Sequence, residues 1–171
     1  MKRAASFILL LTFTFFSCEV KVSNPSSKDA KTEKTSSKIR NGIQLKANGL
    51  KVEQAFLTYE DGSLVSSENK IDVNQKVVMR LIMDGWKEEN GKVMIGATEK
   101  LTTSEGQTIL DTEDLFGAYP EGVDAKDAKY ITLSAVITRL DELYDHFLVE
   151  FRVWDKKGGG DVTGSYKLYL K

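Results

Sequence analysis

The feature that most constrains the fold of this chain is a strict alternation of apolar and polar side chains in two stretches near its C-terminal end. The first is residues 130–139 (YITLSAVITR), with Ile131 and Leu133 among its apolar positions. The second is residues 146–154 (HFLVEFRVW), in which every second residue from Phe147 is apolar. A period of two puts alternate side chains on opposite faces of a β-strand. Both stretches therefore predict half-buried strands, connected by the turn-like sequence LDELYD.

The same alternation predicts further strands along the chain. Four more stretches show it: residues 50–59, 76–83, 92–101 and 165–171, with short candidates at 43–47 and 108–110. In the stretch 50–59 the inward set changes phase near Glu53-Gln54, which predicts a β-bulge. Asn90-Gly91 lies between two strands and is a hairpin turn signal, because a positive φ costs these residues little.

This pattern predicts a mainly β fold with seven or eight strands. Only the residues after Asp111 and those near Asp124 look like helical turns. Many short strands with one long connection, residues 102–129, favour a two-sheet antiparallel sandwich of immunoglobulin-like type, with that connection as a Greek-key crossover. A closed barrel is the alternative, because periodicity alone does not distinguish the two.

The first residues of the chain have the organisation of an export signal. Lys2 and Arg3 precede an apolar run from residue 4 to residue 16. That run is shorter than the roughly 20 apolar residues that a membrane-spanning helix needs. A charged start, a short apolar core and a small residue before the cut are typical of a secretory signal peptide, expected here over residues 1–17.

The only cysteine, Cys18, follows this segment directly. Phe15-Phe16-Ser17-Cys18 resembles the bacterial lipobox, although Phe15 stands where leucine is usual and Phe16 where a smaller residue is usual. The resemblance implies cleavage before Cys18 and lipidation of Cys18 with diacylglycerol and palmitate. It implies a lipoprotein held on a membrane of the cell envelope, expected to be the outer membrane, on its periplasmic or surface face, since Glu19 is not the aspartate linked to inner-membrane retention. An ordinary secretory signal or an uncleaved anchor is the alternative.

Residues 18–41 are expected to be the lipidated cysteine and a disordered polar tether. From residue 19 the segment is rich in Ser, Thr and Lys, has no aromatic residue, and carries six basic against three acidic side chains. Such a composition buries too little apolar surface to offset the entropy of ordering it. This excess of positive charge fits either a solvated spacer or a segment that contacts anionic lipid headgroups.

The remaining residues, 42–171, are expected to form one β-sandwich domain. They contain 16 Lys and Arg against 22 Asp and Glu, so this segment is acidic. No basic stripe or nucleic-acid-binding motif is present, so nucleic acid is not an expected partner. With a single cysteine, the fold does not depend on an intrachain disulfide.

The sequence predicts a non-catalytic role and no cofactor. It has a single histidine, His146, and none of the common hydrolase, phosphate-loop or dinucleotide motifs. Acidic residues at expected loops suggest a calcium site, because hard cations bind carboxylate oxygens. The candidate ligands are Asp111, Glu113, Asp114, Asp155 and Asp161. Solvated acidic loops are the alternative.

Aromatic side chains at strand ends suggest a second kind of binding site. Trp86 follows one expected strand and Trp154 ends another. Exposed rings stack on sugar faces, whereas rings at strand ends also close the ends of a sandwich. The sequence thus leaves two classes of partner for the domain, a glycan or another protein of the envelope.

Overall fold

The computed structural model describes residues 38–138 and 142–171, and these form a mainly β fold without a helix. Thirteen strands lie in this part of the chain, more than the seven or eight that the sequence predicts. They are β1 (Lys38–Ile39), β2 (Gln44–Asn48), β3 (Lys51–Tyr59), β4 (Lys70–Ile71), β5 (Lys76–Asp84), β6 (Glu88–Glu89), β7 (Lys92–Val93), β8 (Ile95–Thr103), β9 (Thr108–Asp111), β10 (Val123–Asp124), β11 (Tyr130–Val136), β12 (Phe147–Asp155) and β13 (Asp161–Leu170).

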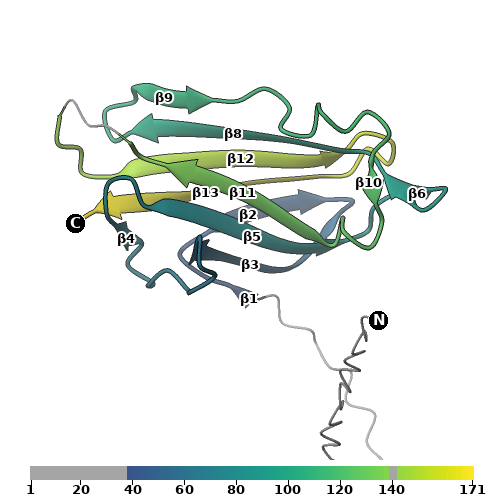
Figure 1. The fold of residues 1–171 in the computed structure, drawn as a ribbon, viewed down its shortest axis with the longest axis horizontal. Coiled ribbons are helices and arrows are strands. Elements are labelled where there is room, and N and C mark those ends of the chain that lie inside the picture. The colour runs from purple at the N-terminus through teal and green to yellow at the C-terminus, as the bar shows by residue number, and fades with distance from the viewer. Residues whose placement is uncertain (1–37, 139–141) are drawn as a thin grey trace, which may run out of the picture. The chain divides into compact units, whose positions relative to one another are not determined.

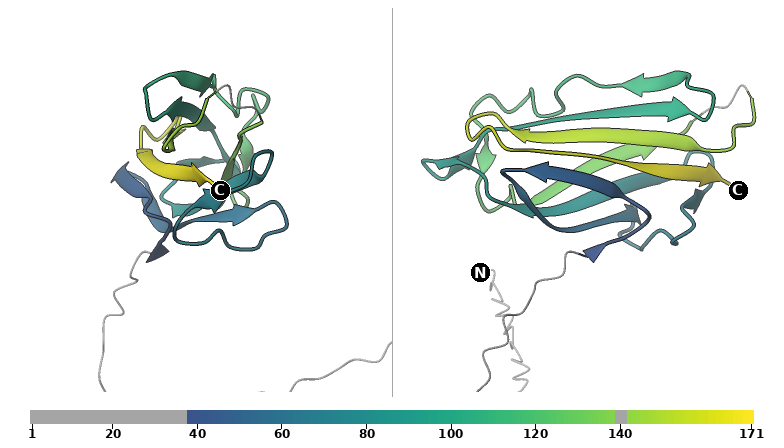
Figure 2. Two further views of the ribbon diagram at one scale, coloured as in Figure 1. Left: turned by 90° about the vertical axis from the view of Figure 1, so that its left-hand side faces the viewer. Right: turned by 180° about the vertical axis from the view of Figure 1, so that it is seen from behind.

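Two large sheets face each other in a sandwich-like arrangement (Figure 1). The first has the order β1-β3-β5-β11, and the second has the order β2-β13-β12-β8-β9, with β4 paired to β13. A small third sheet, β10-β7-β6, lies at one end of the sandwich (Figure 2). Each large sheet ends in edge strands, so the structure is not a closed barrel. Most pairings are antiparallel, and the β1–β3 and β4–β13 pairs are parallel.

The predicted alternation describes the core correctly. Every second residue of β5, β11 and β12 is buried, and the inward side chains of both sheets form one apolar cluster. β11 and β12 are consecutive in the chain but belong to opposite sheets, since β11 pairs with β5 whereas β12 pairs with β13 and β8. The segment between them therefore crosses from one layer to the other.

Two local predictions are confirmed at residue level. The register of β3 against β5 shifts between Val52 and Gln54, which is the bulge expected from the change of phase. β6 and β7 form a hairpin whose two connecting residues, Asn90 and Gly91, have φ angles of 53° and 75°. These left-handed values suit the tight turns that match the twist of paired strands.

The excess over the predicted strand number comes from very short strands. Five of the thirteen, β1, β4, β6, β7 and β10, are two residues long, which is too short for a periodicity to appear. The two expected helical segments are turns instead. Gly117 N donates to Asp114 O, and Ala128 N donates to Asp124 O, but neither bond continues into a helix.

The folded body includes residues that the sequence assigned to the tether. Lys38 and Ile39 pair with β3. Asn41 is buried, and its Nδ2 lies within hydrogen-bonding distance of Val65 O, at 3.2 Å, and Asn69 Oδ1, at 2.9 Å, while its Oδ1 accepts from Leu57 N. The expected boundary at residue 42 therefore lies inside the ordered body. The expected signal peptide, Cys18 and residues 19–37 of the expected tether lie outside the described residues.

In the part of the chain that the structure describes, no helix is long and apolar enough to cross a membrane.

Candidate functional site

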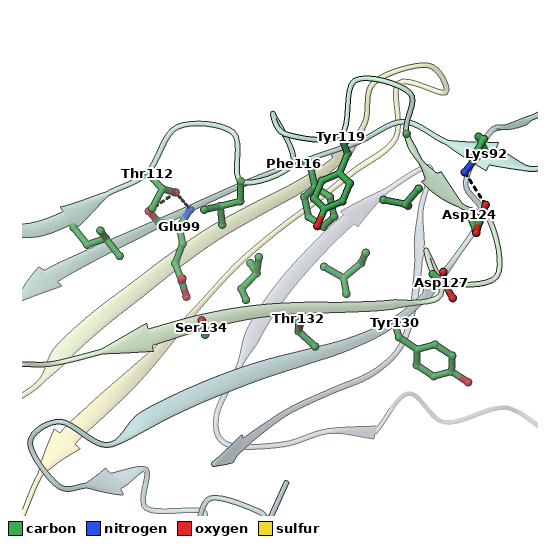
Figure 3. Close-up of a pocket in the computed structure, with 16 residues that line it drawn as sticks. Lys92, Glu99, Thr112, Phe116, Tyr119, Asp124, Asp127, Tyr130, Thr132 and Ser134 are labelled. Carbon is green, nitrogen blue, oxygen red and sulfur yellow. Dashed lines mark hydrogen bonds and ion pairs between the residues drawn. The ribbon is translucent and has the colours of Figure 1, made fainter. Parts of the chain in front are cut away.

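A groove opens between the two sheets on the side where β9 and β11 are the edge strands (Figure 3). Its volume is about 660 Å³. One wall comes from β8 and β9, the other from β11, and the connection between β9 and β11 forms its rim. A cavity of this size is in the range of small-molecule binding sites. We refer to it below as the open-side groove.

Aromatic rings line the rim of the open-side groove. The ring centroids of Phe116 and Tyr119 lie 6.0 Å apart, tilted by 48°. A turn brings them together, because Tyr119 N donates to Phe116 O. Tyr119 is 54% exposed, and Tyr130, at the start of β11, is 63% exposed. These rings offer flat apolar faces at the mouth of a partly polar groove.

The rim is fixed to β8 by hydrogen bonds. Thr112 Oγ1 accepts from Glu99 N at 2.7 Å and donates to Glu99 O at 3.0 Å. Asp114 Oδ1 accepts from Ala97 N and from Phe116 N, and its carboxylate also pairs with Lys156. These contacts hold the connection against the edge of the second sheet and set the position of Phe116.

The floor of the groove contains a buried carboxyl group. Glu99 occupies an inward position of β8, is 2% exposed, and extends from that strand into the space between β8 and β11 (Figure 3). Its Oε1 has no hydrogen-bond partner among the described residues. The carboxyl group also lies near the hydroxyl of Tyr166 on β13, which does not line the groove. Burial raises the pKa of Glu99 to about 7. The Tyr166 hydroxyl acts to lower this pKa, but burial has the larger effect.

The other charged groups lie at the far end of the groove from Glu99 (Figure 3). Lys92 Nζ is 2.8 Å from Asp124 Oδ1, so this cation already has a partner. Asp127 lines the same end and is exposed. Gly122 holds the chain there with a φ of 76°, and a Cβ at this position would meet Val93 O at 2.5 Å. Only glycine allows the connection to approach β7 so closely.

The edge of β11 supplies backbone groups to the groove. Met83 N donates to Lys129 O, and antiparallel pairing alternates from that point, so Ile131 and Leu133 exchange their bonds with β5. The N–H and C=O groups of Thr132 and Ser134 consequently face the unpaired side. Both residues line the groove.

The two tryptophans proposed from the sequence lie elsewhere. Trp86 packs against the core, and its buried Nε1 has no hydrogen-bond partner within the described ranges. Trp154 lies over Gly96 of the neighbouring strand, and the guanidinium carbon of Arg152 is 5.3 Å from its ring centroid. Neither tryptophan lines the open-side groove. Trp86 thus contributes to the core, whereas Trp154 lies half-buried on the outward side of β12.

The five acidic residues considered for calcium are not brought together. In residues 38–138 and 142–171, no three His, Cys, Asp or Glu side chains are placed to hold a metal ion. Asp114 and Asp161 pair with Lys156 and Arg152, respectively. Asp155 instead accepts backbone hydrogen bonds, while Asp111 and Glu113 are exposed. The loops that carry these acidic residues therefore do not bring them together as a calcium site would require.

The residue that sequence reasoning missed is Glu99. It continues the inward series Val93, Ile95 and Ala97, and a charged residue at such a position is the signal that could have identified it. The pairing of Tyr119 with Phe116 depends on a turn that periodicity does not predict.

The comparisons with known proteins give little further information. No family model matches the chain. No curated protein matches it in sequence. Among solved structures, the crystal structure of the C-terminal domain of wzt is similar, with 13% sequence identity and a TM-score of 0.49, covering 77% of this chain and 80% of that one. A likeness of this degree supports no conclusion about ligand or partner.

Proposed function

We propose that this protein is a membrane-anchored, non-catalytic binding protein, whose lipid is attached at Cys18 and whose open-side groove binds an oligosaccharide. The single observation that carries the ligand proposal is the combination of exposed aromatic rings with unpaired hydrogen-bonding groups in one groove.

Each part of the groove suits a sugar. Tyr119 and Phe116 offer ring faces, on which the C–H face of a sugar packs. The unpaired backbone groups of Thr132 and Ser134 and the carboxyl of Glu99 are partners for hydroxyl groups. The lining mixes apolar and polar residues, and placed polar groups fix the orientation of a small ligand.

The anchoring part of the proposal is supported by the sequence alone. The charged start, the apolar run and the lipobox-like residues before Cys18 favour a lipoprotein of the cell envelope, expected in the outer membrane. The expected immunoglobulin-like architecture belongs to the same proposal, and two facing, mainly antiparallel sheets support it.

Binding to an array of immobilised oligosaccharides tests the ligand proposal. The wild-type protein is expected to bind at least one sugar, and Tyr119→Ala is expected to weaken that binding about fivefold or more, because stacking on an aromatic ring contributes about 1 kcal/mol or more. Tyr169→Ala is the matched control, since Tyr169 is a partly exposed tyrosine of β13 outside the open-side groove. Equal losses in both variants, or no binding by the wild type, would contradict the proposal.

A second candidate is binding of an extended peptide of an envelope protein. It is favoured by the free edge of β11, whose seven residues include no charge. Edge strands of soluble proteins usually carry charges that discourage pairing, and an unprotected edge accepts an added strand. Crosslinking from Ser134→Cys in the full-length protein distinguishes the two, because a protein adduct is expected only for the peptide.

A further inference from the structure

The floor of the open-side groove contains one buried carboxyl oxygen that the fold leaves unsatisfied. Glu99 Oε1 has no hydrogen-bond partner among the described residues, although its side chain is almost fully buried. The hydroxyl of Tyr166 on β13 does not line this groove, and it acts to lower the pKa of Glu99 without outweighing burial. Buried polar groups are nearly always hydrogen-bonded, so each exception calls for an explanation.

The surroundings of Glu99 contain no cation that would pair with it. Its neighbours on β11, Ile131 and Leu133, are apolar. From β13 the titratable group is Tyr166, and from the rim connection the near residue is Thr112, which bonds the backbone of Glu99 and not its carboxyl. On β12, Phe151 is the residue opposite Glu99.

The charged groups of the groove give it a negative character. Lys92 is neutralised by Asp124, and the remaining groups, Asp127 and Glu99, are acids. No lining residue offers an unpaired cation to an anionic ligand. A carboxylate or phosphate on the ligand would therefore meet like charge, which disfavours binding.

We propose that Glu99 is the specificity-determining residue on the floor of the groove, where it accepts a hydrogen bond from a hydroxyl of a neutral sugar and excludes acidic sugars. This inference rests on the proposed function and defines its ligand class. A hydroxyl donor satisfies the unpaired carboxyl oxygen, and hydrogen bonds to an ionised carboxylate are stronger than those between neutral groups.

The proposed contact makes ligand affinity depend on pH. The ionised form of Glu99 is the better acceptor, and its pKa in the free protein is about 7. The ionised fraction rises from about one tenth at pH 6 to about nine tenths at pH 8, so affinity is expected to rise about tenfold across this range. Asp124 contributes no such change, because its interaction with Lys92 holds its pKa below the ordinary aspartate value, so it is ionised throughout this range.

The experiment measures the affinity of the full-length protein for a panel of neutral trisaccharides and the corresponding uronic-acid trisaccharides, at pH 6 and pH 8. The wild type is expected to bind a neutral member about tenfold more tightly at pH 8 and to bind its acidic counterpart at least tenfold more weakly than the neutral one. Glu99→Gln is expected to abolish the pH dependence and to lower the affinity at pH 8.

Glu150→Gln is the matched control, because Glu150 is exposed on the outer face of β12. Thermal melting of each variant establishes that it is folded. If the wild type binds a neutral sugar but Glu99→Gln keeps the same pH profile, or acidic sugars bind equally well, the inference is overturned while the proposed function stands. If the wild type binds no sugar at either pH, both are overturned.

Discussion

At the level of single residues, one carboxyl group in the interior links the stability of this fold to pH. Burial of Glu99 raises its pKa from 4.5 to about 7. The folded state therefore holds the proton more tightly than the unfolded state does. The stabilisation is fully present below about pH 4.5 and is lost as pH rises through about 7, because the unfolded chain gains more from ionisation than the folded one.

Replacing Glu99 by glutamine is expected to remove the loss of folding stability that accompanies the rise in pH. Between pH 5 and pH 8, the free energy of unfolding of the wild type should fall relative to that of Glu99→Gln by about 2–3 kcal/mol, since one pKa unit corresponds to about 1.4 kcal/mol. Urea unfolding at the two pH values measures this difference.

Glu150→Gln provides the comparison for this change, as an exposed glutamate whose removal is expected to leave the pH dependence of the wild type intact. A constant difference between wild type and Glu99→Gln at pH 5 and pH 8 would show that the carboxyl is not protonated in the folded state.

At the level of elements, the connection between β12 and β13 is organised by one aspartate. Asp155 Oδ1 accepts from Lys157 N and Gly158 N, at 2.8 and 2.7 Å, and Oδ2 accepts from Lys87 N at 2.6 Å. Burial acts to raise the pKa of Asp155, but these backbone hydrogen bonds outweigh it, and the pKa lies below its ordinary value. The carboxylate thus joins the β12–β13 turn to the segment before β6.

Asp155→Ala is expected to destabilise the protein at pH 7 by about 1–3 kcal/mol, because three backbone amides lose a charged acceptor. The contribution is present above the ordinary aspartate pKa and is lost as pH falls through the lower folded-state pKa, so the difference should narrow under strongly acidic conditions. Thermal unfolding at pH 7 and pH 3 measures both effects.

Glu113→Ala, at an exposed position of the rim connection, is the matched control for Asp155→Ala and should change stability by less than about 0.5 kcal/mol. Equal effects of the two substitutions would mean that the turn does not depend on its carboxylate.

Long strands were predictable from the sequence because their inward residues repeat at every second position, as in β5, β11 and β12. The two-residue strands were not, since they depend on tertiary contacts rather than on their own pattern. The groove could not be predicted from the sequence either. It forms where β11 and β9 end different sheets, and pairing between distant strands leaves no trace in local periodicity.

At the level of the whole molecule, the chain joins segments of opposite charge. Residues 19–41 carry an excess of three positive charges, whereas residues 42–171 carry an excess of six negative charges. If Cys18 is lipidated, the basic segment lies next to the membrane surface, where anionic headgroups attract it. The same headgroups repel the acidic body.

Lipidation itself is testable in cells that process bacterial lipoproteins. Full-length protein is expected to incorporate labelled palmitate and to fractionate with membranes, whereas Cys18→Ala should be unlabelled and released, because several acyl chains are needed for stable attachment. Ser17→Ala, which keeps a small residue before the cysteine, serves as the control and should remain labelled. A Cys18→Ala protein that stays in the membrane fraction would refute the anchor.

The uncharged free edge of β11 has a consequence for the protein when its groove is empty. Two molecules confined to one membrane surface meet far more often than two in dilute solution, and bare strand edges without charge join readily to one another. Under the proposed function, a ligand that occupies the backbone groups of Thr132 and Ser134 would remove this opportunity. Ligand binding is then expected to protect against clustering, and the ligand-free form is expected to be the one prone to self-association.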